Sequence, residues 1–202
     1  MKIEGKDRIY EVLAEIVGED NVSNEKHVLW AYSYDMSFVK PSMPQYVTLP
    51  ENVEQIQRIV RLANREKIPI IPFTNGTNVG GLTIPEEGGI ILDLKRMNKI
   101  IKIDEELRFA IIEPGVNHAQ LAEELYKRGL RFGWPVGPPT SSVLACAINH
   151  GIGHFTGRYG INSKSITGME VVLPTGELAR IGSCAINDEV WFSLEPLPLL
   201  SG

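Results

Sequence analysis

The sequence of 202 residues predicts an α+β fold of two α/β subdomains, a small βαβ unit followed by a mainly antiparallel sheet. In the first half, apolar runs at 45–49 and 68–73 flank an amphipathic helix at 51–67, and strands joined in this way run parallel. In the second half, short apolar runs are separated by turn residues, a pattern typical of antiparallel strands. We therefore expect residues 1–40 to form an N-terminal helix and an aromatic-rich segment. Residues 41–104 would form the first subdomain and residues 105–202 the second.

Composition narrows the class of protein. The net charge is −5 and no basic cluster occurs, which argues against nucleic-acid binding. No apolar run approaches the roughly 18 residues of a membrane span, and the N-terminus lacks the apolar core of a signal peptide. Cys146 and Cys184 have neither metal nor redox spacing. Two reduced thiols in a cytoplasmic protein are the expectation.

The first forty residues divide into a helix and a less regular segment. Residues 6–17 place apolar side chains at helical spacing, and Gly18 ends the run. Residues 21–40 then carry several aromatic side chains around Asp35. Aromatic residues at this density either pack a long loop onto a domain or form part of a ligand wall, and the sequence leaves both interpretations open.

The second half contains the expected short strands. Residues 108–113 form one, and Asn117 caps the helix that follows, with His118 in its first turn facing solvent. Residues 168–173 and 177–181 form a hairpin, because a Pro-Thr-Gly turn signal separates them.

An unusual loop lies between the apolar runs at 68–73 and 90–94. Residues 74–81 read Thr-Asn-Gly-Thr-Asn-Val-Gly-Gly. Glycines that reach positive φ let several backbone N–H groups turn toward one point, and such a nest binds anions. No Lys-Ser/Thr follows Gly81, and the loop leads into a strand, so neither of the two commonest phosphate motifs fits. The alternatives are a phosphate or pyrophosphate loop of strand–loop–strand type and an ordinary surface loop.

A second stretch, residues 137–160, combines prolines, hydroxyl side chains and spaced glycines. Such a backbone can pass close to a flat or charged ligand. The alternative is a long glycine-rich surface loop, although loops of this length are uncommon in compact domains unless they are functional.

Six motifs follow one another along the chain. They are the P-x-x-x-G-x-x-x-G-G loop, Gly-Gly-Ile-Ile-Leu-Asp-Leu at 88–94 and Glu-Pro-Gly-Val at 113–116. Ser-Val-Leu at 142–144, Tyr-Gly at 159–160 and Gly-Met-Glu-Val-Val-Leu-Pro-Thr-Gly-Glu at 168–177 come after them. Together they resemble the FAD-binding domain of the vanillyl-alcohol oxidase/p-cresol methylhydroxylase (PCMH) family, over residues 41–182. The resemblance implies a PCMH-type fold with FAD between the two subdomains.

The resemblance also implies which residues hold FAD. The implied pyrophosphate contacts are Thr74, Asn75, Gly76, Thr77, Asn78, Val79 and Gly80. The implied flavin contacts are Ser141, Ser142, Gly153, His154, Gly157, Arg158, Tyr159 and Gly160. Among these, His154 would bond the ring, and Arg158 is either a counter-charge or a surface residue.

The implied activity is oxidation of a small-molecule substrate by hydride transfer to FAD. The motifs of the second stretch favour a phenolic substrate of the 4-cresol or vanillyl-alcohol kind, and a glycolate or D-lactate dehydrogenase stays open. Gly137 stands where vanillyl-alcohol oxidase has an acidic residue, so no catalytic residue is assigned. His150 and His154 have no third ligand nearby, and no metal is expected.

Family members continue with a cap domain beyond the point where this sequence ends. Residues 191–200 are strongly apolar and would need a cover. The expectation is a cap-bearing partner chain or a homo-oligomer. The further alternatives are a flavin-binding or assembly subunit without activity of its own, and a truncated chain.

Overall fold

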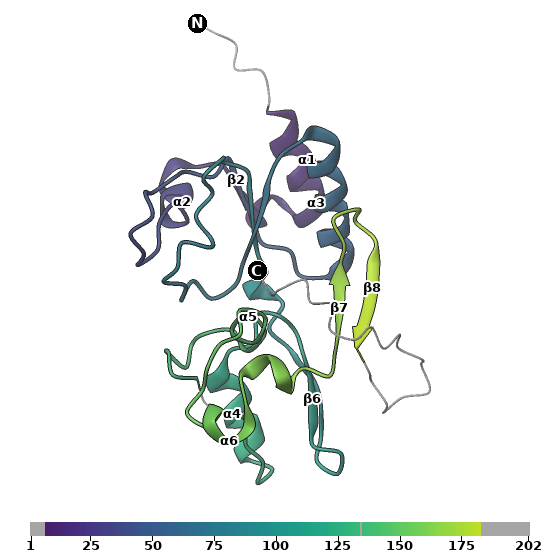
Figure 1. Ribbon diagram of the computed structural model, residues 1–202. Helices are drawn as coiled ribbons and strands as arrows, with labels where there is room; N and C mark the ends of the chain where they lie inside the picture. The colour runs from purple at the N-terminus through teal and green to yellow at the C-terminus, as the bar shows by residue number, and fades with distance from the viewer. Residues whose placement is uncertain (1–6, 134, 183–202) are drawn as a thin grey trace, which may run out of the picture.

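The computed structural model describes residues 7–133 and 135–182, which form two lobes joined at one side (Figure 1). The upper lobe comprises α1 (Arg8–Val17), the 3-10 turn η1 (Glu19–Asn21), β1 (Val22–Ser23), α2 (Lys26–Ala31), β2 (Tyr46–Thr48), α3 (Val53–Glu66), β3 (Ile70–Phe73), β4 (Ile90–Asp93) and the 3-10 turn η2 (Leu94–Arg96). Its two longer helices begin at capping residues that the sequence supplies. Asp7 accepts from the amides of Ile9 and Tyr10, and Asn52 accepts from that of Gln55.

The upper lobe is built on a four-stranded sheet in the order β1-β2-β4-β3. Both β2 and β3 run parallel to β4, which lies between them, and β1 is antiparallel to β2. The prediction that the strands flanking α3 run parallel is confirmed. The central position of β4 explains its unbroken apolar run, because all four of its residues are buried.

Helices cover both faces of this sheet. Side chains of β2 and β4 alternate between the two faces, as the period of a strand requires. Ile90 packs with residues of α1 and α3, and Ile91 packs with Leu29 of α2. Figure 1 shows α1 and α3 together on one side of the sheet and α2 on the other. The carboxyl ends of β3 and β4 therefore lie at one edge of a three-layer lobe.

The lower lobe comprises β5 (Ile100–Asp104), β6 (Phe109–Ile112), α4 (His118–Tyr126), α5 (Val143–Ile148), α6 (Thr156–Tyr159) and the 3-10 turn η3 (Asn162–Ser165). Its core joins Val116, Leu121 and Leu125 to Val143 of α5. Asn117 caps α4 as predicted, accepting from the amide of Gln120 at 2.8 Å.

Two features of this lobe differ from the sequence analysis. The alternative of one long loop at residues 137–160 does not hold, because these residues contain α5 and α6. Strand β5 was not anticipated, and it pairs antiparallel with β6 from Asp104 opposite Phe109 to Ile100 opposite Ile112. The expected boundary between residues 104 and 105 falls at the turn of this hairpin. The division into subdomains itself stays a prediction.

The hairpin of β7 (Gly168–Val172) and β8 (Leu178–Gly182) is confirmed. It packs on α3 of the upper lobe (Figure 1). Gln57 Nε2 and Arg61 Nη2 each donate to the carbonyl of Gly176 at 2.9 Å, and Asn64 donates to that of Pro174. The turn is thereby tied to the upper lobe. The apolar run at 191–200 and Cys184 lie outside the described residues.

Candidate cofactor-binding site

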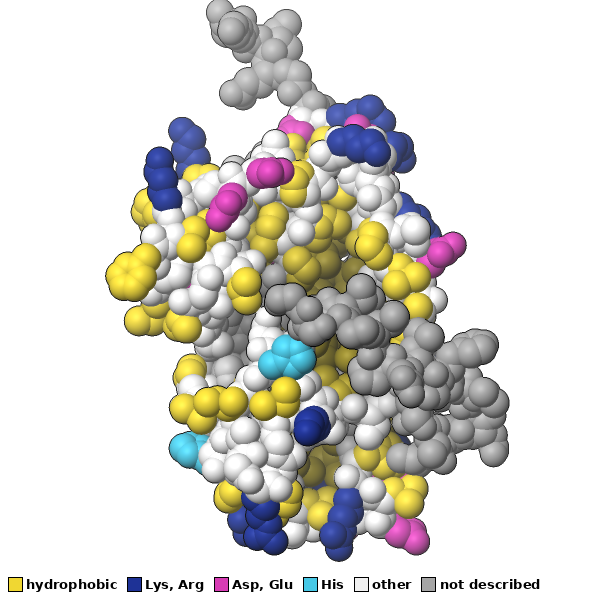
Figure 2. All heavy atoms as spheres, in the orientation of Figure 1, with side chains coloured by type: hydrophobic (Ala, Val, Ile, Leu, Met, Phe, Trp, Pro, Cys, Tyr) yellow, Lys and Arg dark blue, Asp and Glu magenta, His cyan; other side chains and the backbone are white. Residues whose placement is uncertain are grey.

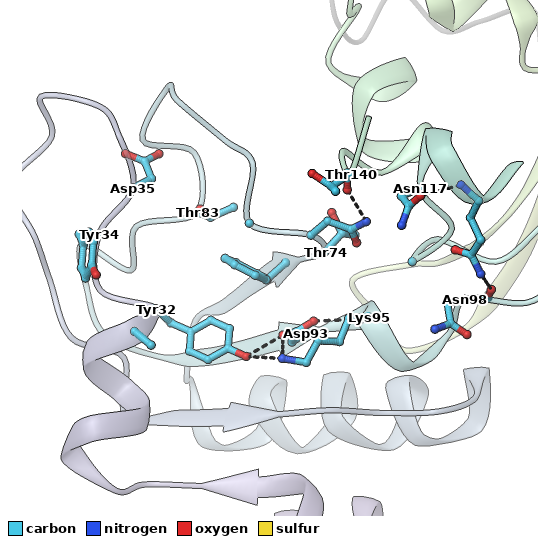
Figure 3. Close-up of a pocket in the computed structure, with 16 residues that line it drawn as sticks. Tyr32, Tyr34, Asp35, Thr74, Thr83, Asp93, Lys95, Asn98, Asn117 and Thr140 are labelled. Atoms are coloured by element: carbon cyan, nitrogen blue, oxygen red, sulfur yellow. Dashed lines mark hydrogen bonds and ion pairs between the residues drawn. The ribbon is translucent and has the colours of Figure 1, made fainter. Parts of the chain in front are cut away.

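A cleft of about 550 Å³ lies between the two lobes, within the range typical of small-molecule sites. Both lobes and the segment after α2 contribute to it (Figure 3). Its lining residues are Ala31, Tyr32, Tyr34, Asp35, Phe73, Thr74, Asn75, Gly76, Thr83, Asp93, Lys95, Asn98, Gly115, Asn117, Gln120 and Thr140. The cleft thus opens at the carboxyl ends of β3 and β4, where ligands bind in open α/β sheets.

The predicted loop at 74–81 forms part of the cleft wall. Thr74, Asn75 and Gly76 line the cleft directly after β3. Gly76 has φ of +65°, and a Cβ there would lie 3.0 Å from Cζ of Phe73. A side chain at this position is therefore disfavoured both by the backbone conformation and by the neighbouring ring.

The backbone amides of this loop fall into two groups. The amide of Gly80 donates to Asn78 Oδ1 at 3.0 Å, and that of Gly81 donates to Asp35 Oδ2 at 2.7 Å. Among the described residues, no acceptor is found for the amides of residues 75–79. A short loop with five consecutive unpaired amides has donors to offer a bound anion.

Direct contacts join the lobes around the cleft. Asn75 Nδ2 donates to the carbonyl of Thr140 at 2.8 Å, which ties the loop to the lower lobe (Figure 3). Gly115 approaches the upper lobe so closely that a Cβ would lie 2.7 Å from the carbonyl oxygen of Leu94. The glycine of the Glu-Pro-Gly-Val motif is therefore needed where the two lobes meet.

The floor of the cleft holds a compact polar cluster (Figure 3). Tyr32 Oη donates to Asp93 Oδ2 at 2.7 Å, and Lys95 Nζ lies 2.9 Å from both of these oxygens. Asp93 is fully buried, and its other oxygen accepts from the amide of Lys95 at 2.9 Å. Its charge is thus compensated locally, and Lys95 is the one cationic side chain among the described residues that line the cleft.

This cluster shifts the pKa values of its outer members. Burial raises the pKa of Tyr32, and the hydrogen bond to Asp93 adds to the rise. Burial acts to lower the pKa of Lys95, but its bonds to Tyr32 and Asp93 outweigh this and raise it. Both groups therefore stay protonated at neutral pH, which leaves a positive charge in the cleft.

Two predicted flavin contacts, Ser141 and Ser142, lie where the second stretch packs on α4. Ser142 is buried, donates from Oγ to the carbonyl of Pro114 at 2.7 Å and caps α5 through the amide of Ala145. Its side chain is occupied in this arrangement. The residue of this segment that lines the cleft is Thr140.

The prediction that His118 faces solvent is wrong, since this residue is only 3% exposed. The second stretch covers the first turn of α4, and the amide of His118 donates to the carbonyl of Ser141 at 3.1 Å. His118 Nδ1 lies 3.0 Å from the same oxygen and 3.2 Å from Oγ of Ser141. Burial lowers the pKa of His118. Its Nε2 is buried without a partner in the part of the chain that the structure describes.

The other predicted flavin contacts lie around α6. His154, Gly157, Arg158 and Tyr159 are exposed, Gly153 is buried and Gly160 is intermediate. Arg158 stacks on Tyr159, with 5.2 Å from its guanidinium carbon to the ring centroid. None of these residues lines the cleft described above, and their contact with FAD stays a prediction.

Charge and metal-binding potential are distributed unevenly. Figure 2 shows Lys and Arg side chains at the outer ends of both lobes, over α2, over α1 and α3 and at the bottom, with mostly hydrophobic and uncharged side chains between. Within residues 7–133 and 135–182, no group of three or more His, Cys, Asp and Glu side chains is placed to hold a metal ion. No helix in the same ranges has the length and apolar character needed to cross a membrane.

The site fits FAD. The amides of residues 75–79 have no acceptor among the described residues, and Asn75 and Gly76 of this run line the cleft. The cleft holds one lysine, and the carboxylates of Asp35 and Asp93 are already occupied by donors from the protein. A family model described as the FAD binding domain matches residues 44–182. The chain belongs to this family. Its cofactor is FAD, and the family is one of flavin-dependent oxidoreductases.

Similar proteins come from two substrate groups. The chain is 33% identical over 190 residues to glycolate oxidase subunit GlcD of Bacillus subtilis (strain 168), covering 94% of this chain and 40% of that protein. It is 35% identical over 173 residues to the 4-cresol dehydrogenase [hydroxylating] flavoprotein subunit of Pseudomonas putida, covering 83% and 33%. The crystal structure of p-cresol methylhydroxylase with substrate bound superimposes with a TM-score of 0.80 at 32% identity, covering 90% and 36%.

These similarities confirm the PCMH-type α+β fold of the FAD-binding domain. The chain spans a third to two fifths of the length of these relatives. What the whole protein oxidises is therefore a matter for proposal.

Sequence reasoning missed most of the cleft outside the first loop. Ala31, Tyr32, Tyr34 and Asp35 belong to the segment at 21–40, for which a ligand wall was one of the two interpretations left open. The other residues not anticipated as site residues are Phe73, Thr83, Asp93, Lys95, Asn98, Gly115, Asn117, Gln120 and Thr140. Two signals were present. Asp93 directly follows the apolar run of β4, and polar residues at the carboxyl ends of parallel strands mark binding sites. Asn117 is a helix cap directly after the Glu-Pro-Gly-Val motif, which itself brings the lobes together.

Proposed function

We propose that FAD binds in the cleft between the lobes with its pyrophosphate on the loop at residues 74–79. The observation that carries this is the run of five amides, residues 75–79, for which no acceptor is found among the described residues. The hydroxyls of Thr74 and Thr77 add neutral donors beside them. Lys95 supplies positive charge at the cleft floor, where it is held by Asp93 and Tyr32.

The chain's own residues bind and orient the cofactor. When bound, the isoalloxazine ring of FAD supplies the hydride-accepting chemistry. The contacts from Asn75 to Thr140 and from Gly115 to the upper lobe keep the two walls of the cleft together. The β7–β8 turn is held on α3 of the upper lobe by Gln57 and Arg61.

The substrate we propose is a phenol of the 4-alkylphenol class. Support comes from the motifs of the second stretch and from the likeness to the 4-cresol dehydrogenase flavoprotein subunit and to p-cresol methylhydroxylase. The second candidate is a 2-hydroxy acid, because the match to the glycolate oxidase subunit covers more of this chain, 94% against 83%.

We further propose that the substrate-binding surface is contributed by polypeptide beyond these 202 residues, in the same chain or in a partner or second copy. The relatives named above are about two and a half to three times as long as the part this chain matches. Size-exclusion chromatography with light scattering on the purified protein tests the partner or second copy. A monomer that oxidises substrate by itself would contradict this arrangement.

The cofactor proposal is tested by comparing three flavins. Calorimetric titration of the flavin-free chain should give an affinity for FAD at least tenfold higher than for FMN or riboflavin. Only FAD has the pyrophosphate that the loop would hold. Equal affinities for FAD and FMN would contradict the assignment of the loop.

The substrate proposal is tested by anaerobic reduction of the FAD-loaded protein with the polypeptide beyond these 202 residues, or the partner that supplies it, present. We expect bleaching of the flavin absorbance with 4-alkylphenols and none with glycolate or D-lactate. Reduction by the hydroxy acids alone would favour the second candidate substrate, a 2-hydroxy acid. Because this test uses loaded protein, its outcome is independent of the flavin comparison.

A further inference from the structure

A carboxylate from a distant part of the chain holds the glycine-rich loop. Asp35 lies between α2 and β2, 43 and 46 residues before the two loop residues that it contacts, Asn78 and Gly81. Its Oδ2 accepts from the amide of Gly81 at 2.7 Å and from Nδ2 of Asn78 at 3.0 Å. Figure 3 shows Asp35 on the opposite side of the cleft from Asn117 and Asn98.

The position of Asp35 is itself fixed by its neighbours. Its Oδ1 accepts from the amide of Ser37 at 2.7 Å, and Oγ of Ser37 accepts from the amide of Val39 at 3.1 Å. Val39 in turn contacts the loop, since a Cβ on Gly81 would lie 2.4 Å from its Cγ2. Gly81 also has φ of +77°, so the loop and the segment at 35–39 fit together only with glycine here.

Asn78 extends this anchor along the loop. Its Nδ2 donates to Asp35, and its Oδ1 accepts from the amide of Gly80 at 3.0 Å. The amides of Gly80 and Gly81 are therefore both satisfied within the protein. The result is a loop whose second part is anchored while the amides of residues 75–79 remain available.

The charge of Asp35 makes this arrangement unexpected beside a site for an anion. Partial burial acts to raise the pKa of Asp35, but the hydrogen bonds from Ser37 and Gly81 outweigh it and hold the pKa below its usual value. The carboxylate is thus ionised at neutral pH. By charge alone it would repel a pyrophosphate and weaken FAD binding. Whether removing the charge weakens or strengthens FAD binding therefore distinguishes a positioning role from a purely electrostatic one.

We propose that Asp35 is a positioning residue for FAD binding. It holds the loop at residues 74–81 in the conformation that binds the pyrophosphate. This inference rests on the proposed cofactor site. The gain from a preorganised loop exceeds the repulsion between the carboxylate and the phosphates. Removing the charge should therefore weaken FAD binding, whereas a purely electrostatic role would strengthen it.

The test is calorimetric titration of FAD into the flavin-free Asp35→Asn chain. An amide at this position cannot accept from Ser37, Gly81 and Asn78 together, and we expect the dissociation constant to rise about tenfold. Asp104→Asn is the matched control. Asp104 also accepts a turn amide, from Leu107 at 2.9 Å, and its pKa is likewise lowered, first by that bond, but it does not line the cleft. The control should bind FAD like the wild type.

Unchanged or tighter binding by Asp35→Asn would overturn the inference and leave the proposed function intact. Failure of the wild type to prefer FAD over FMN would instead overturn the proposed function. The two failures are therefore distinguishable in one series of titrations.

A second readout separates positioning from general stability. Thermal unfolding with and without FAD gives the increase in melting temperature that the ligand produces. A merely structural role would lower the melting temperature of the flavin-free variant and leave this increase unchanged. We expect the increase itself to shrink, and an unchanged increase would overturn the inference.

Asn78→Ala provides the same test through a milder change. It removes the bridge to Gly80 and leaves the bonds of Asp35 to Gly81 and Ser37 in place. We expect the dissociation constant for FAD to rise about threefold. In the double variant with Asp35→Asn, the loss of FAD affinity should be smaller than the sum of the two single losses, expressed as free energies, because both residues act on one loop. Unchanged binding by Asn78→Ala would overturn the inference even if Asp35→Asn failed to fold.

Discussion

The two glycine-rich stretches, residues 74–81 and 137–160, have similar composition but differ in what their backbones do. The first connects β3 to β4, places three consecutive residues on the cleft and leaves five amides without a described acceptor. The second folds into α5 and α6 and brings only Thr140 of its described residues to the cleft. Glycine content thus does not identify a ligand loop.

The difference lies in where the polar groups find partners. In the second stretch, helix caps and turns take up backbone amides: Ser142 caps α5, and Oγ1 of Thr156 accepts from the amide of Gly153 at 2.7 Å. In the first stretch Gly80 and Gly81 have partners, but no acceptor is found among the described residues for the amides of residues 75–79. The first stretch therefore differs in combining an anchored end with a run of open amides.

The largest expected effect concerns a glycine of the second stretch that serves packing. A Cβ on Gly151 would lie 2.3 Å from Sγ and 2.6 Å from the carbonyl oxygen of Cys146. Since backbone cannot move aside as a flexible side chain can, Gly151→Ala should lower the free energy of unfolding by about 3 kcal/mol. Urea denaturation measures this. A loss below about 1 kcal/mol would mean that the close contact is not maintained in solution.

The next effect concerns a glycine of the first stretch that serves binding. Gly76→Val places a branched side chain at φ of +65° beside the loop amides. We expect FAD affinity to fall at least tenfold, about 1.4 kcal/mol or more. The loss in free energy of unfolding should be smaller than this loss in binding free energy. Unchanged affinity in a folded variant would make the first stretch as structural as the second.

Sequence reasoning succeeded where local rules decide the structure. The cap Asn117, the parallel direction of β2 and β3 and the β7–β8 hairpin all follow from residue type and periodicity. It failed where a partner is distant in the sequence. The burial of His118 depends on its contact with Ser141, and the role of Asp35 depends on its hydrogen bond from Gly81.

Strand β5 was missed for a different reason. Its apolar residues Ile100, Ile101 and Ile103 are interrupted by Lys102, and the turn at 105–108 has no glycine or proline. The hairpin is completed by Arg108 at φ of +57°, a conformation that cannot be predicted from an arginine at this position. Neither residue periodicity nor a turn signal therefore marks this hairpin.

A smaller effect tests the contact between the second stretch and α4. The pKa of His118 is lowered by burial, so the folded state favours the neutral ring. Its contribution to stability is complete above the unfolded pKa of about 6.5 and is lost as pH falls toward the folded value. Urea denaturation at pH 7 and pH 5 should show a smaller loss for His118→Leu than for the wild type. An equal loss in both proteins would mean that this histidine is not buried in solution.

The smallest expected effect is also the one that tests the comparison most directly. Gly157 lies in α6, has no positive φ, and a Cβ there would meet nothing within 4 Å. Gly157→Ala should therefore leave the fold intact and stabilise it by about 0.5 kcal/mol, because alanine loses less backbone entropy than glycine. The resemblance to the flavoprotein family nevertheless places Gly157 against the flavin, where an added methyl group would interfere. Since Gly157 is exposed and does not line the cleft, we expect FAD affinity within about twofold of the wild type by the same calorimetric titration, an energy difference of roughly 0.4 kcal/mol. A fall of tenfold, as expected for Gly76→Val, would show that both stretches approach the cofactor and that α6 closes on it when FAD is bound.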